Sequence, residues 1–348
     1  MVVVRAARQS DIDGLMALAT LVGDGMTTLK ADLRMLGERV ATACASFAEE
    51  IAPQERDYLF VMEDLERHLV VGVCAIKGAV GLREPFYNYR IGTLVHSSIE
   101  LDIFARMETL YLSNDLTGSA ELCSLFLHPS YRIGANGKLL SKSRFLFMAQ
   151  FPALFPQTII AEMRGFQRAD GVSPFWENLG RHFFQMDFKR ADDLSSLGKK
   201  SFIAELMPRH PLYVAYLPRE AQEVIGMVHV DTAPARHLLE QEGMFYAGFV
   251  DIFDAGPVLQ ARLADLRASR DSRIVAVDAR QPAPGQIEAA AMQPILAAST
   301  RMTDFRAIVV DGRAGAVALD TAQRAALGVT TGDMVRILPL NPEKHAHG

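Results

Sequence analysis

The chain of 348 residues and 38.3 kDa is longer than the roughly 100–200 residues of one ordinary domain, which indicates two domains or one elaborated domain. Its composition is 49% hydrophobic and 22% charged, so a disordered, collagen-like or coiled-coil chain is excluded. The 36 basic residues are outnumbered by 41 acidic ones, giving a formal net charge of −5. Because nucleic-acid-binding proteins usually carry a basic excess, we expect no nucleic acid partner.

Cysteine usage and hydropathy indicate the compartment. Cys44, Cys74 and Cys123 are far apart and form no CxxC pair, so we expect neither a disulfide framework nor a thiolate metal site. The apolar start at Met1–Arg5 is too short for a signal peptide, and no apolar run approaches the ~20 residues that span a bilayer. We therefore expect a cytoplasmic protein with no membrane partner.

The first third of the chain alternates helical and strand patterns. In chain order these are a strand at 2–5, a helix capped by Ser10–Asp11, a helix capped by Thr27–Thr28 that runs to Phe47, and hairpin strands at 58–62 and 69–76.

The next elements surround a glycine-containing loop. An apolar strand at Leu122–Leu127 leads into a loop with Gly134 and Gly137, and a helix follows through Met148. A strand at 158–163 and a helix at 174–179, closed by Gly180, come next. This order predicts an α/β (α+β) domain over residues 1–190, with the glycine loop after its fourth strand.

The remaining chain is predicted to form two further segments. In residues 191–258, a helix at 234–242 ends at Gly243 and leads into an aromatic pair, as the helix at 174–179 does, which allows a duplicated fold. In residues 259–348, a Pro-, Gly- and Ala-rich linker at 279–300 precedes short strands at 307–310, 316–319 and 334–338. These strands favour a small β-barrel-like segment.

The strand–glycine loop–helix unit is the pattern most informative about chemistry. Backbone N–H groups of such a loop, with the positive end of the helix dipole, can hold a pyrophosphate. Gly137 would let the backbone approach phosphates closely, and Arg132, Lys138 and Lys142 would add positive charge. The unit has neither a P-loop nor a Rossmann fingerprint, and an ordinary tight turn is the alternative.

This unit resembles the coenzyme A loop of GNAT-type N-acyltransferases. That loop reads Arg or Gln, two residues, Gly, one residue, then Gly or Ala. Residues 132–137 read Arg-Ile-Gly-Ala-Asn-Gly, with Ala135 at the first glycine position, where Gly134 would supply the flexibility. The resemblance implies a mixed sheet with flanking helices.

A more specific resemblance, to the arginine N-succinyltransferase family, extends from Tyr87 to Pro257. The segments that carry it are Tyr87–Arg90, Leu112–Gly118, Glu121–Leu127, Gly137–Arg144, Ala161–Gly165, Ser173–Trp176, Ala204–Pro208, Val228–His229 and Tyr246–Pro257. The family implies transfer of a succinyl group from succinyl-CoA to the α-amino group of L-arginine, without a metal or redox cofactor. It also implies a homo-oligomer, or a hetero-oligomer with a paralogous subunit. An ornithine-preferring paralogue and a non-catalytic CoA-binding subunit are the alternatives.

The family resemblance assigns roles to two residues. It implies that His229 is the proton donor, a role that suits an imidazole because its pKa lies near neutrality. It also implies that Leu125 contacts succinyl-CoA, through backbone groups of the strand before the glycine loop. From the residues alone, His229 is one of nine histidines and a structural role stays open.

Substrate recognition requires charged partners. Arg90, Arg164 and Ser124 are candidates for the succinyl carboxylate, and Asp115, Glu121 and Glu162 for the arginine guanidinium. Glu162 and Arg164 are two residues apart on a predicted strand, so they face the same side and pairing with each other is the alternative. We expect Cys123, in an apolar strand, to be buried and not a nucleophile.

Overall fold

The strands assemble into one long mixed sheet. The computed structural model describes residues 1–22, 28–196, 201–278, 292–313 and 317–342. Its strands are β1 (Val2–Ala6), β2 (Asp57–Asp64), β3 (Leu69–Lys77), β4 (Asn88–Ser98), β5 (Ile103–Ser113), β6 (Ala120–Leu127), β7 (Thr158–Glu162), β8 (Leu212–Tyr213), β9 (Phe245–Asp251), β10 (Pro257–Arg262), β11 (Arg273–Ala276), β12 (Gln293–Ser299), β13 (Arg306–Gly312) and β14 (Met334–Pro339). Their order in the sheet is β11-β14-β12-β13-β1-β2-β3-β6-β7-β10-β9-β4-β5-β8.

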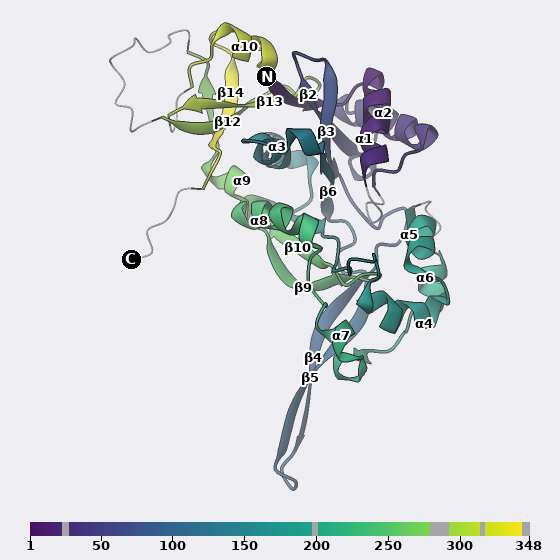
Figure 1. The fold of residues 1–348 in the computed structure, drawn as a ribbon. Helices are drawn as coiled ribbons and strands as arrows, with labels where there is room; N and C mark the ends of the chain where they lie inside the picture. The colour runs from purple at the N-terminus through teal and green to yellow at the C-terminus, as the bar shows by residue number, and fades with distance from the viewer. Residues whose placement is uncertain (23–27, 197–200, 279–291, 314–316, 343–348) are drawn as a thin grey trace.

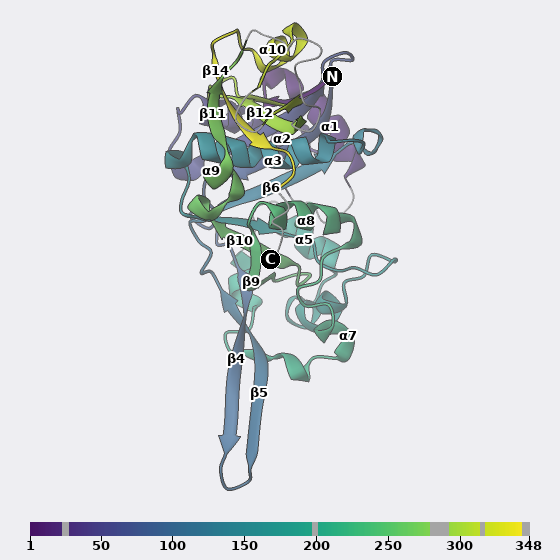
Figure 2. The ribbon, with the colours of Figure 1, turned by 90° about the vertical axis from the view of Figure 1, so that its left-hand side faces the viewer.

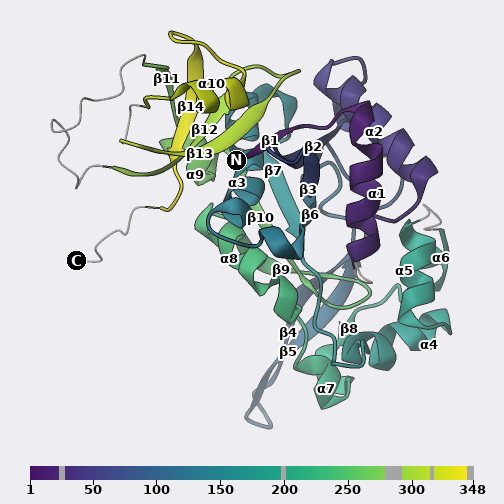
Figure 3. The same ribbon diagram turned by 45° about the horizontal axis from the view of Figure 1, so that its top comes forward.

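Helices cover both faces of this sheet (Figures 1 and 3). They are α1 (Ile12–Leu21), α2 (Leu33–Phe47), α3 (Asn136–Gln150), α4 (Arg181–Phe184), α5 (Phe188–Ser196), α6 (Ser201–Leu206), α7 (Arg219–Gln222), α8 (Ala233–Gln241), α9 (Arg267–Asp271) and α10 (Thr321–Leu327). The alternation of β2 shows how the sequence produces the layers, because Leu59 and Val61 pack with α1 and α2 while Phe60 packs with α3. No helix among these residues is long and apolar enough to cross a membrane. The expected mixed sheet with flanking helices is confirmed.

Three predicted helix boundaries differ from the structure. Asp32, not Thr28, caps α2 by accepting a hydrogen bond from the Met35 N–H at 2.9 Å. Asp11 does not cap α1, because its carboxylate is bound by the Arg5 guanidinium. Gly180 does not end its helix, since a π-helical turn at Trp176–Gly180 continues directly into α4. The glycine packs on the Trp176 ring, where a Cβ would come within 2.4 Å.

The hairpin of β4 and β5 was not among the predicted elements. Its strands pair along their whole length, from Asn88 with Ser113 to Ser98 with Ile103. Its outer part extends away from the body of the protein (Figures 1 and 2). We call residues 91–108 the arm. The glycine loop therefore follows the sixth strand of the chain and not the fourth.

The C-terminal strands extend the main sheet. β13 pairs with β1 through Val4 and Ala307, so the expected barrel-like segment continues the sheet instead of closing on itself. β12 occupies the end of the predicted linker, whose residues 279–291 lie outside the described chain. The predicted strand at 316–319 is reduced to one bridge between Asp278 and Ala318, and residue 316 is also outside the description.

A buried carboxylate joins this C-terminal part to the rest of the fold. Glu242 binds the Lys142 ammonium of α3 at 2.9 Å and the Arg267 guanidinium of α9 at 2.7 Å. The same two cations donate to the carbonyl oxygens of Leu340 and Pro339, which follow or end β14. Burial lowers the pKa of Lys142, against the effect of Glu242. This cluster therefore fixes α3, α8, α9 and β14 relative to one another.

We expect Glu242→Gln to lower the free energy of unfolding by about 3–5 kcal/mol, because two buried cations lose their counter-ion. Urea denaturation followed by circular dichroism measures this loss. The matched control is Glu240→Gln, which breaks an exposed pair with Arg236 on the same helix and should cost less than about 1 kcal/mol. Equal losses in the two variants would contradict the proposed importance of Glu242.

Candidate active site

The site begins where two parallel strands separate. β6 and β7 pair only through Ala120 with Ile159 and Glu121 with Ile160. β6 continues to Leu127 without a further register pair to β7 among the described residues. On its other side β6 contains a bulge, since Ser124 and Leu125 together lie opposite Cys74 of β3. Ser124 has a φ of +54°, a conformation that costs a non-glycine residue roughly 1 kcal/mol or more. The bulge interrupts the ladder at two residues that line the gap, Ser124 and Leu125, and a bulge bends its strand locally.

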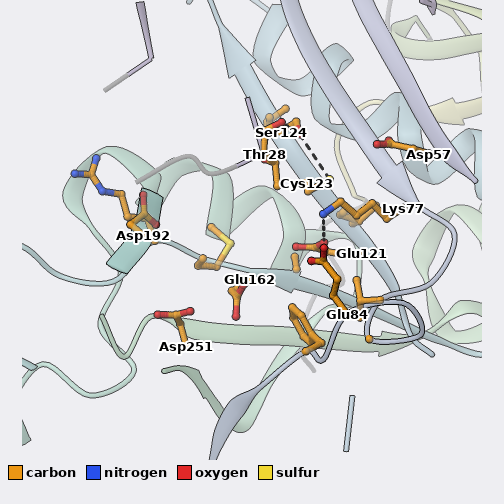
Figure 4. A pocket seen from close by; sticks show the side chains of 18 of the residues that line it. Thr28, Asp57, Lys77, Glu84, Glu121, Cys123, Ser124, Glu162, Asp192 and Asp251 are labelled. Atoms are coloured by element: carbon orange, nitrogen blue, oxygen red, sulfur yellow. Dashed lines mark hydrogen bonds and ion pairs between the residues drawn. The ribbon is translucent and has the colours of Figure 1, made fainter. Parts of the chain in front are cut away.

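A cavity of about 780 Å³ occupies this gap (Figure 4). That volume lies within the roughly 300–1,000 Å³ of small-molecule sites. Its lining includes six consecutive residues of β6, the end of β7, the loop after β9, and parts of α5 and α8; among them are Glu121, Cys123, Ser124, Leu125, Arg132, Glu162, Arg164, Asp192, Asp231, Thr232, Asp251 and Asp254. Leu125 is thus at the cavity, and its side chain also packs against the main core.

The glycine loop presents an uncapped helix end beside the cavity. α3 follows Ala135, whose side chain makes no capping hydrogen bond. Ala135 has an ordinary φ of −95°, and Gly134 takes the left-handed conformation at +55°, so alanine at this position does not disturb the loop. At Gly137 an added Cβ would meet nothing within 4 Å. The loop therefore has an open backbone face and lies at the positive end of the helix dipole, which are the two features that favour phosphate binding.

The three cations expected around this loop lie in three different places. Arg132 lines the cavity and is held by the Leu127 carbonyl oxygen at 3.1 Å and by the Phe126 ring. Lys138 donates to the Asn341 side chain at 2.6 Å, which directs it to the C-terminal segment. Lys142 is fully buried on Glu242, so the expectation that it adds charge at the loop is wrong. A helix residue one turn further along from Lys138 faces the core here.

His229 lies at the edge of the cavity. Its backbone N–H donates to the Arg164 carbonyl oxygen at 2.9 Å, and Arg164, Asp231 and Thr232 all line the cavity. Nδ1 lies 3.2 Å from the backbone nitrogen of Asp231 and 3.6 Å from the Asp231 carboxylate. Without a hydrogen, Nδ1 accepts from the backbone N–H, and with a hydrogen it faces the carboxylate. Burial and the Arg164 charge lower the pKa of His229, which keeps the imidazole neutral at pH 7.

Glu162 and Arg164, the two residues predicted to bind substrate, both line the cavity. Glu162 accepts a hydrogen bond from the Asn88 amide at 3.0 Å. The Arg164 guanidinium binds Gln167, and its buried Nε has no hydrogen-bond partner within the part of the chain that the structure describes. Arg164 therefore has a donor left for an anionic ligand.

Two other candidates lie elsewhere. Arg90 and Asp115 form an exposed ion pair at 3.4 Å, and neither is among the residues lining this cavity, so we discard both as substrate contacts. Arg90 lies on β4, and Asp115 lies in the turn after β5, so both belong to the hairpin and not to the strands that border the cavity. Ser124 lines the cavity, but its hydroxyl is buried and accepts from the Arg39 guanidinium at 2.9 Å. Cys123 is buried, and burial raises the pKa of its thiol, as expected for a residue that is not a nucleophile.

Several charged residues of the cavity were missed from the sequence. Lys77 lies opposite Asp57 on β2 and opposite Glu121 on β6, and its ammonium is 3.4 Å from the Glu121 carboxylate. Asp192 and Asp251 face the same space from α5 and the end of β9 (Figure 4). Charged residues at the ends of buried apolar strands were the available signal for Asp57, Lys77 and Asp251.

Burial controls the protonation of these carboxylates. It raises the pKa of Asp192 to about 6, although Lys30 at 3.5 Å counteracts the shift. Burial and the adjacent charge of Asp254 raise the pKa of Asp251. Carboxylates in such a state gain strongly from a cationic ligand, which compensates for the lost hydration.

Strands that separate at a bulge, a glycine loop leading to an uncapped helix, and a cavity between them define an N-acyltransferase that uses an acyl-CoA. The known proteins most similar to the chain agree with this class. The family described as arginine N-succinyltransferase beta subunit matches residues 2–268, and its C-terminal domain matches residues 283–339.

Relatives from bacteria are similar over the full length. The arginine N-succinyltransferases of Shigella dysenteriae serotype 1 and Escherichia coli K12 are each 48% identical over 346 residues, covering 99% of both chains. The structure of arginine/ornithine succinyltransferase subunit AI from Pseudomonas aeruginosa aligns with a TM-score of 0.87 and 34% identity, covering 98% of this chain and 99% of the other. The chain belongs to the arginine N-succinyltransferase family.

We expect Gly137→Ala to weaken CoA binding at least about tenfold, the scale of one lost hydrogen bond to a charged group. The added methyl group has room in the free protein but would stand between the backbone and a phosphate. Isothermal titration with CoA measures the affinity.

The matched control is Gly37→Ala in α2, where an added Cβ also meets nothing within 4 Å. Both substitutions should stabilise their helices by up to roughly 1 kcal/mol. Wild-type CoA affinity in Gly137→Ala would show that the phosphates lie elsewhere.

Proposed function

We propose that the chain transfers the succinyl group of succinyl-CoA to the α-amino group of L-arginine, giving N2-succinylarginine and CoA. The observation that carries this proposal is the cavity between β6 and β7. One wall is the bulged backbone at Leu125, next to the glycine loop, and the other wall carries Glu162, Asp192 and Asp251. A site with a phosphate-binding loop at one end and carboxylates at the other suits an anionic acyl donor and a cationic acceptor.

The acyl donor is proposed to enter along β6. Its phosphates would bind the open backbone of the loop at Gly134 and Gly137, with Arg132 nearby. The thioester would then lie at Leu125, where backbone groups of the bulge are directed toward the cavity. A strand backbone can hold the thioester oxygen whatever the side chain, which is compatible with the packing of Leu125 in the core.

The free succinyl carboxylate is assigned to Arg164. This residue lines the cavity, and its buried Nε lacks a partner among the described residues. A planar guanidinium with a spare donor is the usual partner of a carboxylate. Because Arg164 directly precedes Gly165 and its carbonyl holds His229, the carboxylate and the proton-transferring group would be fixed by the same stretch of chain.

His229 is proposed to move the proton. The neutral amine forms a bond to the thioester carbon, and the carbonyl oxygen takes the negative charge. His229, neutral at pH 7 and with its hydrogen on Nδ1 facing the Asp231 carboxylate 3.6 Å away, takes a proton at Nε2 from the positively charged nitrogen of this adduct. As the carbon–sulfur bond breaks, the same proton passes to the CoA sulfur. These steps use no metal or redox cofactor.

The guanidinium of arginine is assigned to the carboxylates of the opposite wall. Glu162 extends from β7, Asp192 from α5, and Asp251 from the end of β9, and all three face one region of the cavity (Figure 4). Three elements thus each supply one carboxylate for the substrate guanidinium, which carries five N–H donors and a permanent charge. The 48% identity to proteins named arginine N-succinyltransferase supports arginine over ornithine as the acceptor.

The direct test is turnover by the purified chain alone. Initial rates of thiol release are measured with succinyl-CoA or acetyl-CoA as donor and with L-arginine or L-ornithine as acceptor. We expect succinyl-CoA and arginine to be the preferred pair. CoA binding without turnover of any pair would contradict the proposal. A cytoplasmic location and assembly into an oligomer stay predictions.

We expect His229→Asn to lower kcat by about 100-fold or more, because the asparagine oxygen can replace Nδ1 as acceptor for the Asp231 N–H but cannot exchange a proton. Circular dichroism checks that the fold is retained. The matched control is His128→Asn, since His128 makes the same capping contact with the Ser130 N–H at 3.2 Å. Undiminished turnover in His229→Asn would remove this residue from the mechanism.

The pH dependence of kcat/KM should reflect the lowered pKa of His229. Below that pKa the imidazole is protonated and cannot take a proton from the adduct. We therefore expect an acidic limb whose midpoint lies below 6.5, the ordinary value for histidine. The limb should be missing from the residual activity of His229→Asn, and a midpoint above 6.5 would contradict the assignment.

Asp192→Asn should reduce the preference for arginine over the neutral isostere L-citrulline by roughly tenfold or more, the scale of one charged hydrogen bond. The ratio of the two kcat/KM values measures this preference. Asp193→Asn is the matched control, because Asp193 is adjacent, exposed, and bound to the same Lys30. An unchanged ratio in Asp192→Asn would exclude this carboxylate from guanidinium binding.

A further inference from the structure

Arg144 is a buried cation without a counter-ion. It lies on α3 close to Lys142, and both side chains are fully buried. Lys142 is bound to Glu242, whereas no carboxylate pairs with Arg144 in the described part of the chain. Its hydrogen bonds go to neutral acceptors: Nε donates to the Ser141 carbonyl oxygen at 3.2 Å, Nη2 to the Ser141 hydroxyl at 3.2 Å, and Nη1 to the Cys123 carbonyl oxygen at 3.5 Å. The two Nη atoms therefore keep one N–H group each without an acceptor among the described residues.

The surroundings of Arg144 do not neutralise its charge. A guanidinium stays protonated in proteins, even though burial lowers the pKa of this one. The ionisable groups that act on it are the thiols of Cys74 and Cys123. Burial raises the pKa of Cys74 to about 12 and also raises the pKa of Cys123, so both thiols are neutral at pH 7. Because a buried unpaired charge is costly, we expect a ligand to supply the missing negative charge.

Arg144 lies where the reacting group is proposed to bind. It lines the cavity together with Cys123, Ser124 and Leu125. Its bond to the Cys123 carbonyl oxygen fixes the guanidinium at a residue two positions before Leu125 on β6. This is the bulged segment to which the thioester is assigned. The two remaining N–H groups are therefore beside the reacting carbonyl group.

The other cations of the cavity suit different groups. Three of them pair with glutamates, namely Arg56, Lys77 and Arg83. Arg132 is exposed and Arg164 is half-buried, so each can hold a permanent anion that stays partly hydrated. Arg144 is fully buried, and a permanent anion would have to lose its hydration to reach it. A buried donor of this kind suits a negative charge that appears only during the reaction.

We propose that Arg144 is a catalytic residue that stabilises the oxyanion of the tetrahedral adduct, an inference that rests on the proposed acyl transfer. When the amine nitrogen bonds to the thioester carbon, the π electrons of the carbonyl group pass to its oxygen, and a free N–H of Arg144 donates to that oxygen. No proton leaves Arg144. The carbonyl group forms again as the carbon–sulfur bond breaks, and the sulfur takes its proton from His229. A donor already fixed in a water-excluded site needs no reorganisation during these steps.

The kinetics of Arg144→Met in the full chain test this proposal. We expect kcat to fall by about 100-fold or more, the usual effect of losing one oxyanion donor. The KM for succinyl-CoA should change by less than about threefold, because the lost interaction forms only in the transition state. Arg144→Lys keeps a charge at this position and should be faster than Arg144→Met. A strongly raised KM with an unchanged kcat would place the acyl carboxylate at Arg144 and overturn the proposal.

Lys142→Met is the matched control, because the same substitution removes the other fully buried cation of α3. Its Tm should fall, since Glu242 loses a partner, while its kcat stays at the wild-type value. The Tm of Arg144→Met should be unchanged or higher, because an apolar side chain replaces an unpaired charge.

Two results would overturn the assignment of Arg144 alone. One is an unchanged kcat in Arg144→Met while the wild type is active. The other is a Tm of Arg144→Met that falls as far as that of Lys142→Met, which would show a structural role. A wild type that turns over no pair of donor and acceptor would instead contradict the proposed acyl transfer, and this inference with it.

Discussion

The separation of β6 from β7 is the constraint on which the rest of the site depends. Two register pairs hold these strands together, and beyond Glu121 the edge of β6 that would face β7 borders the cavity. Closing the gap would give the sheet more hydrogen bonds and leave no place for a substrate. The fold keeps it open by filling the far sides, with β3 bonded along β6 and β10 bonded along β7. Binding space is thus obtained from the sheet itself and not from a loop.

The distribution of charge follows from the same geometry. The overall excess of acidic residues is uninformative about the site, but Asp192 and Asp251 are kept in a partly dehydrated cavity at an energetic cost. Carboxylates in such a position are poised for a cation, whereas the cation Lys142, which lies on the helix that begins at the glycine loop, is neutralised by Glu242 in the interior. The carboxylates of the cavity therefore lie on the wall formed by β7, α5 and the end of β9.

The sequence predicted what depends on local patterns. The apolar runs at 58–62 and 122–127 are strands, and the loop with Gly134 and Gly137 opens a helix, because hydrophobic period and glycine placement are local properties. It did not predict that Lys77 meets Asp57 and Glu121, since this depends on the register between strands whose paired residues are up to 44 positions apart. The inward direction of Lys142 depends on a glutamate 100 residues away, and the arm has no core of its own from which a pattern could arise.

The pairing of β1 with β13 has a consequence for how the protein is made. β1 leaves the ribosome well before β13, and it gains β2 as a neighbour early, but its other edge stays open until residues 306–312 have been synthesised. Contacts so distant in the chain form slowly, and an open strand edge is a site for mispairing. The nascent chain must therefore hold β1 in an incomplete sheet while about 240 further residues after β2 are added, a span counted from the strand bounds.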